Sequence, residues 1–143
     1  MRIHIGIDDT DSPRGFCTTY LAALLVERIA SFTQFLDFPK LIRLNPNIPY
    51  KTRGNAAIAL HLDSQNPDKV WTLTNKLIQD LAELDYANTN PGCCMVWGDI
   101  TPKVQDLATQ ALTSVVDLKT VFLLSKRENI LIKGYNKKRG VVG

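Results

Sequence analysis

Residues 3–20 read IHIGIDDTDSPRGFCTTY, and this stretch decides the first half of the fold. Isoleucines alternate with small or polar residues, which predicts a buried strand over residues 2–8. Proline and glycine then mark a turn at residues 13–15. Leucines at helical spacing follow and predict a helix over residues 18–31. The stretch therefore predicts a strand, a turn and a helix, with three acids where the strand ends.

The rest of the chain extends this pattern to a recognisable order of elements. We expect further strands over residues 38–45, 55–62 and 93–97, a long helix from Pro67 to Leu84, a third helix capped by Thr101, and two short apolar runs at 121–124 and 130–132 that could pair as a hairpin. The order β-α-β-β-α-β is that of a split βαβ unit. The predicted fold class is α+β: a mixed sheet in split βαβ (ferredoxin-like) order with helices packed on it, plus an extra C-terminal helix and a possible hairpin. A doubly wound fold is the weaker alternative, because no helix joins the second and third strands.

Composition bounds the class of protein. A length of 143 residues, with 45% of them apolar and 22% charged, is typical of one globular domain. The net charge of +3 is compatible with an anionic partner. No apolar run approaches the roughly 18 residues of a membrane span, and no secretory leader is apparent, so we expect a cytoplasmic protein without membrane partners. The three cysteines form no C-x-x-C pair, which favours reduced thiols.

Three acids, Asp8, Asp9 and Asp11, follow the first strand directly. Carboxylate oxygens are ligands that Mg²⁺ prefers, and a bend after the strand could bring them to one ion. The alternative is a cluster that only caps the turn and the helix. Thr18 and Thr19 open the helix, where N–H groups and the helix dipole attract phosphate. Either threonine could instead be the N-cap.

A stiff loop follows the second strand and ends in Lys51-Thr-Arg53-Gly54-Asn55. Lysine and arginine bind phosphate, and a glycine lets a ligand approach the backbone. The alternative is a solvated connection between neighbouring strands. The cluster at residues 88–92 is typical of a turn, and the basic tail at residues 137–143 could be solvated or could pair with phosphates.

Together these segments resemble a known family. GIDDTDSPRGFCTTY at 6–20, LIRLNPNIPYKTRGN at 41–55, TNPG at 89–92 and the basic, glycine-containing tail are similar to the archaeal tRNA-Ile 2-agmatinylcytidine synthetases, TiaS. The similarity runs along the whole chain. It implies that residues 1–143 are a single domain like the family's N-terminal, ATP-using, kinase-like domain, which lacks the usual kinase motifs. The ferredoxin-like, OB-fold and zinc-ribbon domains that follow in the family would then be absent.

The resemblance also implies a chemistry. In the family, ATP and Mg²⁺ activate the C2 carbonyl oxygen of the wobble cytidine in a CAU anticodon, and agmatine displaces the phosphate. The implied enzyme is an ATP-dependent ligase whose partners are ATP, agmatine and the anticodon of tRNA-Ile. Holding the tRNA would require additional domains. The alternative is a non-catalytic nucleotide- or RNA-binding module that is inactive alone.

The residue roles follow from the resemblance and from the patterns above. The implied catalytic residues are Asp8, Asp9, Asp11 and Thr18, where Thr18 matches a threonine that becomes phosphorylated and the three acids would hold Mg²⁺. The candidate nucleotide- or substrate-binding residues are Arg14, Gly15, Thr19, Lys51, Arg53, Gly54, Asn55, Asn90, Gly92, Lys138 and Arg139. The chain stops at Gly143, inside a motif that the family continues, so the tail could fray instead of closing the site.

Overall fold

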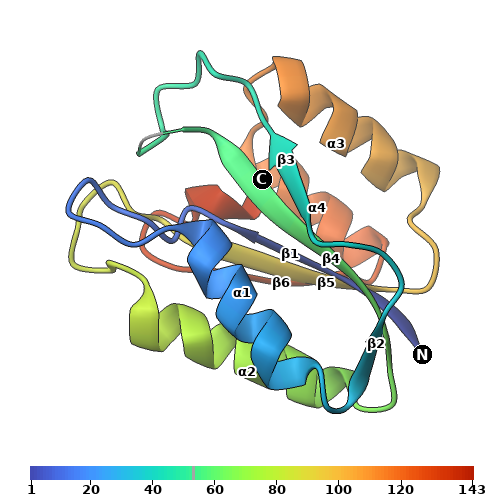
Figure 1. The fold of residues 1–143 in the computed structure, drawn as a ribbon. Coiled ribbons are helices and arrows are strands. Elements are labelled where there is room, and N and C mark those ends of the chain that lie inside the picture. Colours follow the sequence, from blue (N-terminus) through green and yellow to red (C-terminus); the bar gives the residue numbers. More distant parts are fainter. Residues whose placement is uncertain (53) are drawn as a thin grey trace.

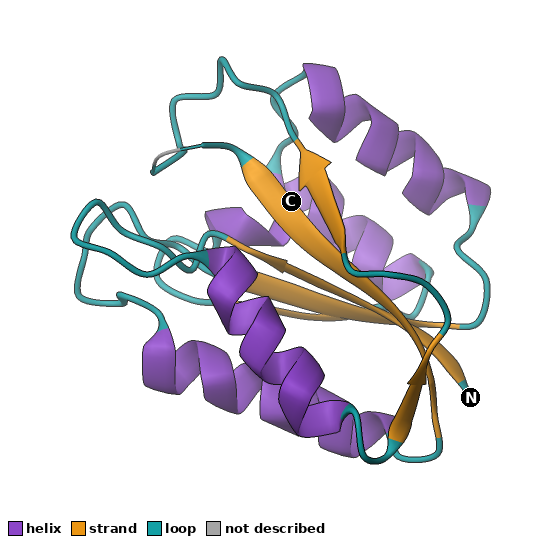
Figure 2. Cartoon of the chain, viewed as in Figure 1, coloured by secondary structure: helices purple, strands orange, loops and turns teal. Residues whose placement is uncertain are grey.

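The protein folds around one six-stranded sheet, seen in a computed structural model that describes residues 1–52 and 54–143. The strands are β1 (Arg2–Asp8), β2 (Thr33–Phe35), β3 (Lys40–Arg43), β4 (Ala56–Ser64), β5 (Gly92–Trp97) and β6 (Leu131–Gly134). The helices are α1 (Thr18–Ile29), α2 (Pro67–Leu81), α3 (Pro102–Thr113), α4 (Leu118–Arg127) and the 3₁₀ turn η1 (Arg139–Val141). Figures 1 and 2 show their arrangement.

The sheet has the expected order. It runs β2-β4-β1-β5-β6, and β3 also pairs with β4. β2 and β3 both pair with β4 and together take the place of the second strand of a split βαβ unit. The order of β2 and β3, β4, β1 and β5 across the sheet is then that of such a unit, and the α+β prediction is confirmed. The prediction of a mixed sheet is corrected, because every pairing between strands is antiparallel in the residues that the structure describes.

The strand expected at residues 38–45 is present as β3, and β2 is a further short strand before it that the sequence did not predict. β2 pairs with the C-terminal end of β4 at residues 62–64, and β3 pairs with its N-terminal end at residues 56–59. The break between them contains Pro39, which lacks the N–H that a continuous ladder needs. The outer edge of the sheet is therefore interrupted.

Helices cover both faces of the sheet. Figure 1 shows α1 and α2 on one face, with α3 and α4 on the other. The main core lies under α1 and α2, where Ile3, Ile5 and Ile7 of β1 are almost fully buried. A smaller cluster on the opposite face joins α3 and α4 to Val141 and Val142 of the tail. The alternation of β1 therefore places its isoleucines in one core and its polar residues, Asp8 included, toward the other face.

The prediction of a C-terminal hairpin is wrong. Residues 121–124 lie inside α4, and residues 131–134 form β6, which pairs with β5. The periodicity of a short apolar run cannot distinguish a strand from a buried segment of a helix. Here Val121 and Ser125, four positions apart, form the buried side of a helix. Two helix ends also differ from expectation, since α1 ends at Ile29 and α2 at Leu81.

Four connecting segments gather at one end of the sheet. They are the β1–α1 loop, the β3–β4 loop, the α2–β5 turn and the tail with η1, all at the left of Figure 1. Hydrogen bonds join them, since Thr52 binds both Asp9 and Asn88, and Gly140 binds Asn90. In the part of the chain that the structure describes, every helix is too short or too polar to cross a bilayer.

Candidate functional site

The site begins where β1 ends. Asp8 is the last residue of the strand and is 9% exposed. Asp9 follows with a φ of 56°, a left-handed conformation that aspartate tolerates better than most residues. This bend turns the chain out of the sheet and allows consecutive carboxyl groups to face one region. The predicted bend after the strand is therefore present, and it is made at Asp9.

Asp9 holds two loops together. Its Oδ1 atom accepts a hydrogen bond of 3.1 Å from the Thr52 hydroxyl, and its Oδ2 atom accepts one of 2.8 Å from the Asn90 backbone N–H. The Thr52 hydroxyl also lies 3.2 Å from the Asn88 carbonyl oxygen. Because both of its oxygens are engaged, Asp9 acts as a clamp between the β3–β4 loop and the α2–β5 turn.

The tail closes over this clamp instead of fraying. The Asn90 carbonyl accepts a hydrogen bond of 2.8 Å from Gly140 N–H, and the Asn90 side-chain oxygen accepts one of 3.0 Å from Lys137 N–H. Gly92 and Gly140 pack backbone against backbone: a Cβ built on Gly92 would lie 2.2 Å from the nitrogen of Val141 and 2.3 Å from the carbonyl carbon of Gly140. Only glycine fits this contact, so the structure gives Gly92 a packing role. Asn90 and Gly92 were predicted to bind nucleotide or substrate, and neither is among the residues that line the cavity beside them.

These segments enclose a cavity of about 30 Å³, which has room for about two water molecules. Its walls combine acids, loop residues and the tail: Asp8, Asp9, Asp11, Leu44, Ile48, Tyr50, Lys51, Thr52, Gly54, Asn55, Ala111, Ser114, Arg139, Gly140, Val142 and Gly143. Tyr50 and Lys51 are exposed and therefore form its rim. A triphosphate is too large for the enclosed part and would have to lie across the rim.

Arg139 brings a partly buried positive charge to this cavity. Its Nε and Nη2 atoms are buried and have no hydrogen-bond partner among the described residues. Its guanidinium carbon lies 4.8 Å from the centre of the Tyr50 ring. A buried N–H without a partner costs roughly 1–3 kcal/mol. The arrangement is that of a donor group prepared for an anionic ligand.

Burial has the largest effect on the pKa values of Asp8 and Asp9. It raises the pKa of Asp8 well above its ordinary value, and the neighbouring Asp9 raises it further. Burial also raises the pKa of Asp9 from 3.8 to about 7, against the hydrogen bonds from Asn90 and Thr52, which lower it. Carboxyl groups in this state favour a nearby cation, because a cation would offset the cost of ionising them.

The donors at the site fit a magnesium ion only in part. Asp8 and Asp11 line the same cavity, and their oxygens are of the type that Mg²⁺ prefers. However, no group of three acids, histidines or cysteines in the described residues is arranged to hold one metal ion. The prediction that all three acids bind Mg²⁺ stays a prediction. Asp9 has both oxygens in hydrogen bonds, and Asp8 Oδ1 accepts a hydrogen bond of 2.7 Å from the Asp9 N–H.

Thr18 lies beside the cavity and does not line it. It is the first residue of α1, whose N-cap is Cys17, so neither threonine is the N-cap that the alternative interpretation required. The Thr18 Oγ1 atom accepts hydrogen bonds from the Thr10 N–H at 3.3 Å and the Thr10 hydroxyl at 3.0 Å. Thr18 and Thr19 line a neighbouring pocket of about 180 Å³ together with Asp11. The helix start and the acids therefore adjoin, with Asp11 between the two pockets.

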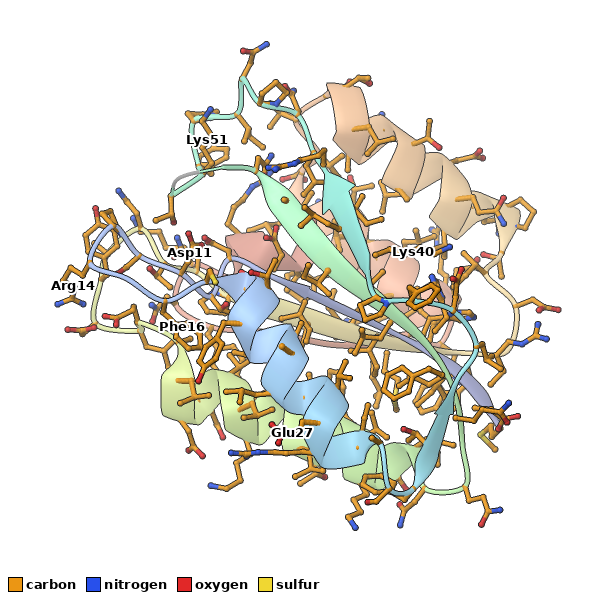
Figure 3. The ribbon with its side chains drawn as sticks, in the orientation of Figure 1. Asp11, Arg14, Phe16, Glu27, Lys40 and Lys51 are labelled. Atoms are coloured by element: carbon orange, nitrogen blue, oxygen red, sulfur yellow. The ribbon has the colours of Figure 1, made fainter. Side chains whose placement is uncertain are left out.

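Other predicted residues lie in different places. Arg14 is at the outer end of the β1–α1 loop (Figure 3) and donates hydrogen bonds to Glu83 at 2.8 Å and Asp85 at 2.7 Å, so it latches this loop to the end of α2. Gly15 and Lys138 are not among the residues that line the cavity. Lys51, Gly54 and Asn55 do line it. Arg53 lies outside the described residues.

Three contributors were missed by the sequence-based prediction. Thr52 supplies the hydroxyl that binds Asp9, Thr10 fixes Thr18, and Tyr50 contacts Arg139. Thr10 and Thr52 each stand between predicted site residues, which was the available signal. Tyr50 precedes Lys51 in a proline-stiffened loop, and an aromatic residue beside a cation is common in nucleic-acid sites.

We predict that the free energy of unfolding falls as the pH rises from about 4 to about 7. Asp9 has a higher pKa when folded than when unfolded, so the folded state binds the proton more tightly and loses this advantage on ionisation. Since Asp9 is partly exposed, we expect a loss on the order of 1–2 kcal/mol. Thermal melts of the wild type and of Asp9→Asn across this range would test the effect. The variant should show a flatter profile, and parallel profiles would contradict the prediction.

Comparisons with known proteins identify the family. The family model for the TiaS TCKD domain matches residues 4–71. The isoleucine-tRNA 2-agmatinylcytidine synthetase TiaS of Thermococcus sibiricus is 43% identical over 145 residues, which cover 100% of this chain and 34% of that protein. This chain spans about a third of the length of the curated relatives that it matches.

Solved structures agree with these relatives. A complex of TiaS with isoleucine tRNA and ATP matches with a TM-score of 0.94 and 39% identity, over 100% of this chain and 34% of that one. A complex of TiaS with isoleucine tRNA, AMPCPP and agmatine matches with a TM-score of 0.91 and 35% identity, over 100% of this chain and 35% of that one. The fold, the sequence and the family model agree, and the protein belongs to the TiaS family.

Proposed function

We propose that this chain is the ATP- and Mg²⁺-dependent phosphoryl-transfer domain of an enzyme that attaches agmatine to the wobble cytidine of an isoleucine tRNA. The observation that carries the proposal is the pair of buried Arg139 nitrogens, which have no hydrogen-bond partner among the described residues, in one cavity with Asp8 and Asp11. Solved complexes of TiaS with ATP, AMPCPP, agmatine and isoleucine tRNA support it. Residues 1–143 would act as one domain, and other parts of the family's longer chain would hold the tRNA.

A phosphate with its metal ion would satisfy both sides of the cavity. Arg139 would donate hydrogen bonds to phosphate oxygens, and Lys51 on the rim would add a second positive charge. Asp8 and Asp11 would hold Mg²⁺, with water and phosphate oxygens as its remaining ligands. Bound Mg²⁺ would neutralise charge on the transferring phosphoryl group. Asp9 would keep the surrounding loops in place through Thr52 and Asn90.

The chain's residues suit phosphoryl transfer, because this reaction depends mainly on positioning and on charge neutralisation. The C2 oxygen of cytidine is a poor leaving group while it is a carbonyl oxygen. Once it has accepted a phosphoryl group, the primary amine of agmatine can attack C2, and the C–O bond breaks with release of phosphate. The cavity would hold the phosphoryl donor, while the base and the amine would approach from the rim.

The experiment is to incubate this chain with Mg²⁺ and γ-labelled ATP, to measure nucleotide binding and to map any label on the protein. We expect binding that requires Mg²⁺ and that Asp8→Asn weakens by about 10-fold or more, because the buried carboxylate would hold the metal. Glu27→Gln is the control variant: it also removes one acid, but Glu27 lies on α1 away from the cavity (Figure 3). Equal affinity in the wild type and Asp8→Asn would contradict the proposal.

One observation favours the second candidate, a nucleotide- or RNA-binding module without transfer to Thr18. The Thr18 side chain is buried, bonded to Thr10, and outside the cavity that contains Arg139. In this candidate, the label would stay on the nucleotide. Thr18→Val would then leave nucleotide affinity unchanged, and no phosphothreonine would form at position 18.

A further inference from the structure

We propose that Tyr50 is a stacking platform for a nucleobase whose phosphate is bound by Arg139. The inference rests on the proposed function only in requiring that the cavity bind phosphate. The ligand class is a nucleobase with an attached phosphate, and its source is either a free purine nucleotide or an unpaired nucleotide of an RNA. Tyr50 and Arg139 line the same cavity as the acids.

The geometry leaves one face of the ring for a ligand. Arg139 places its guanidinium carbon 4.8 Å from the centre of the Tyr50 ring, within the range of a cation–π contact. The Tyr50 residue nevertheless remains 50% exposed. Since the guanidinium lies over one face and half of the residue is exposed, we infer that the other face is accessible to a ligand. A flat aromatic ligand could therefore stack on the face that Arg139 leaves open.

The loop that carries Tyr50 is already organised. Ile48 is 8% exposed and anchors the loop two residues before Tyr50. Asn45 accepts a hydrogen bond of 3.0 Å from Asn47 N–H, and Thr52 binds Asp9 at 3.1 Å two residues after Tyr50. The Lys51 ammonium donates a hydrogen bond to the carbonyl of Pro46. A platform held in this way loses little conformational freedom when a ligand stacks on it.

The same pair explains how a base and its phosphate would be bound together. The guanidinium lies over the Tyr50 ring, while its Nε and Nη2 atoms remain without partners among the described residues. Those atoms can therefore donate to phosphate without giving up the contact with the ring. The base would lie on the open face of Tyr50, at the rim, and the phosphate would point toward Arg139 and the acids.

Tyr50 differs in this respect from the other exposed aromatic residues. Tyr20 is 54% exposed and packs edge-on against Phe16, with ring centres 5.5 Å apart. Phe38 is 86% exposed. Neither of these rings lines the cavity. Tyr20 is thus a matched control: a tyrosine of similar exposure without the nearby cavity.

The test compares ligands that share phosphates but differ in the base. We would measure affinities for ATP, inorganic triphosphate and a short oligocytidylate, all with Mg²⁺, in the wild type, Tyr50→Leu, Tyr50→Phe and Tyr20→Leu. Stacking of a base on an aromatic ring contributes about 1–3 kcal/mol, or roughly 5- to 150-fold in affinity. Tyr50→Leu should lose at least about 5-fold for the base-bearing ligand. Tyr50→Phe and Tyr20→Leu should match the wild type.

The pattern of losses identifies the source of the base. A loss for ATP with unchanged triphosphate affinity would support a free nucleotide, and a loss confined to oligocytidylate would support an RNA base. Equal losses for ATP and triphosphate would overturn the inference, because Tyr50 would then only position Arg139. Unchanged affinity for every ligand in Tyr50→Leu would overturn it as well. Failure of the wild type to bind triphosphate would instead refute the proposed phosphate cavity, which is a separate result.

Discussion

Replacement of Gly140 by alanine is expected to reduce nucleotide affinity by at least about 100-fold and to destabilise the fold by about 3 kcal/mol. A Cβ atom at this position would lie 2.5 Å from the Gly92 nitrogen and 2.8 Å from the Asn90 carbonyl oxygen. Both neighbours are backbone atoms of the sheet and its turn, so they cannot move aside as a side chain would. The tail would have to leave the site and take Arg139 with it.

The measurement combines calorimetric titration of ATP with thermal unfolding. Hydrogen exchange at η1 would show whether the tail alone has been released, even if the fold is weakened. Gly6→Ala is the matched control, because the Cβ there would meet only the Cys94 thiol, at 2.8 Å, and a side chain can adjust. Wild-type affinity in Gly140→Ala would show that the tail packing does not form the site.

Replacement of Arg139 by methionine should have the opposite effect on stability. Methionine keeps much of the length but removes buried donors for which residues 1–52 and 54–143 supply no partner, which relieves about 1–3 kcal/mol. The lost cation–π contact with Tyr50 costs about 0.5–1 kcal/mol, so the desolvation effect is larger. We therefore expect a gain of about 1 kcal/mol in unfolding free energy. Nucleotide affinity should fall about 50- to 100-fold, because a charged donor to phosphate is lost.

Arg139→Lys separates the charge from the forked geometry. Lysine keeps the charge but loses the paired N–H groups, so an intermediate loss of affinity is expected. Chemical denaturation of the three forms, together with titration of inorganic triphosphate, would measure both effects. A destabilised Arg139→Met variant that still binds triphosphate would mean that Arg139 supports the fold and not the ligand.

Much of the fold was predictable because local periodicity reflects burial. The strand of residues 2–8 was predicted with its observed bounds, since the isoleucines at alternate positions all enter one core. Residues 121–124 of α4 were mistaken for part of a hairpin because their apolar run is short. The left-handed residue Asn129 lies between that helix and β6, and nothing in the periodicity predicts this. Pairing of β6 with β5 is a long-range contact that a local pattern does not contain.

The residues around the cavity were predictable in part. The acids, Lys51 and Arg139 were named from residue types and from the family resemblance, and the structure places them around one cavity. Arg14 was grouped with them because of its charge and its position in the same motif. Its ion pairs with Glu83 and Asp85 depend on where α2 ends, which the motif does not specify.

The sequence by itself determined most elements from β1 to α3, with β2 missed, and which segments carry acids, hydroxyl groups and cations, because these properties depend on residue type and spacing. Only the tertiary structure decided which role each of these residues has. Asp9 became a clamp because its left-handed backbone points its carboxyl at two loops. Arg139 reached the acids because Gly92 and Gly140 allow two backbones to touch. Contacts between residues far apart in sequence arise from the packing of the whole chain, and local patterns do not encode them.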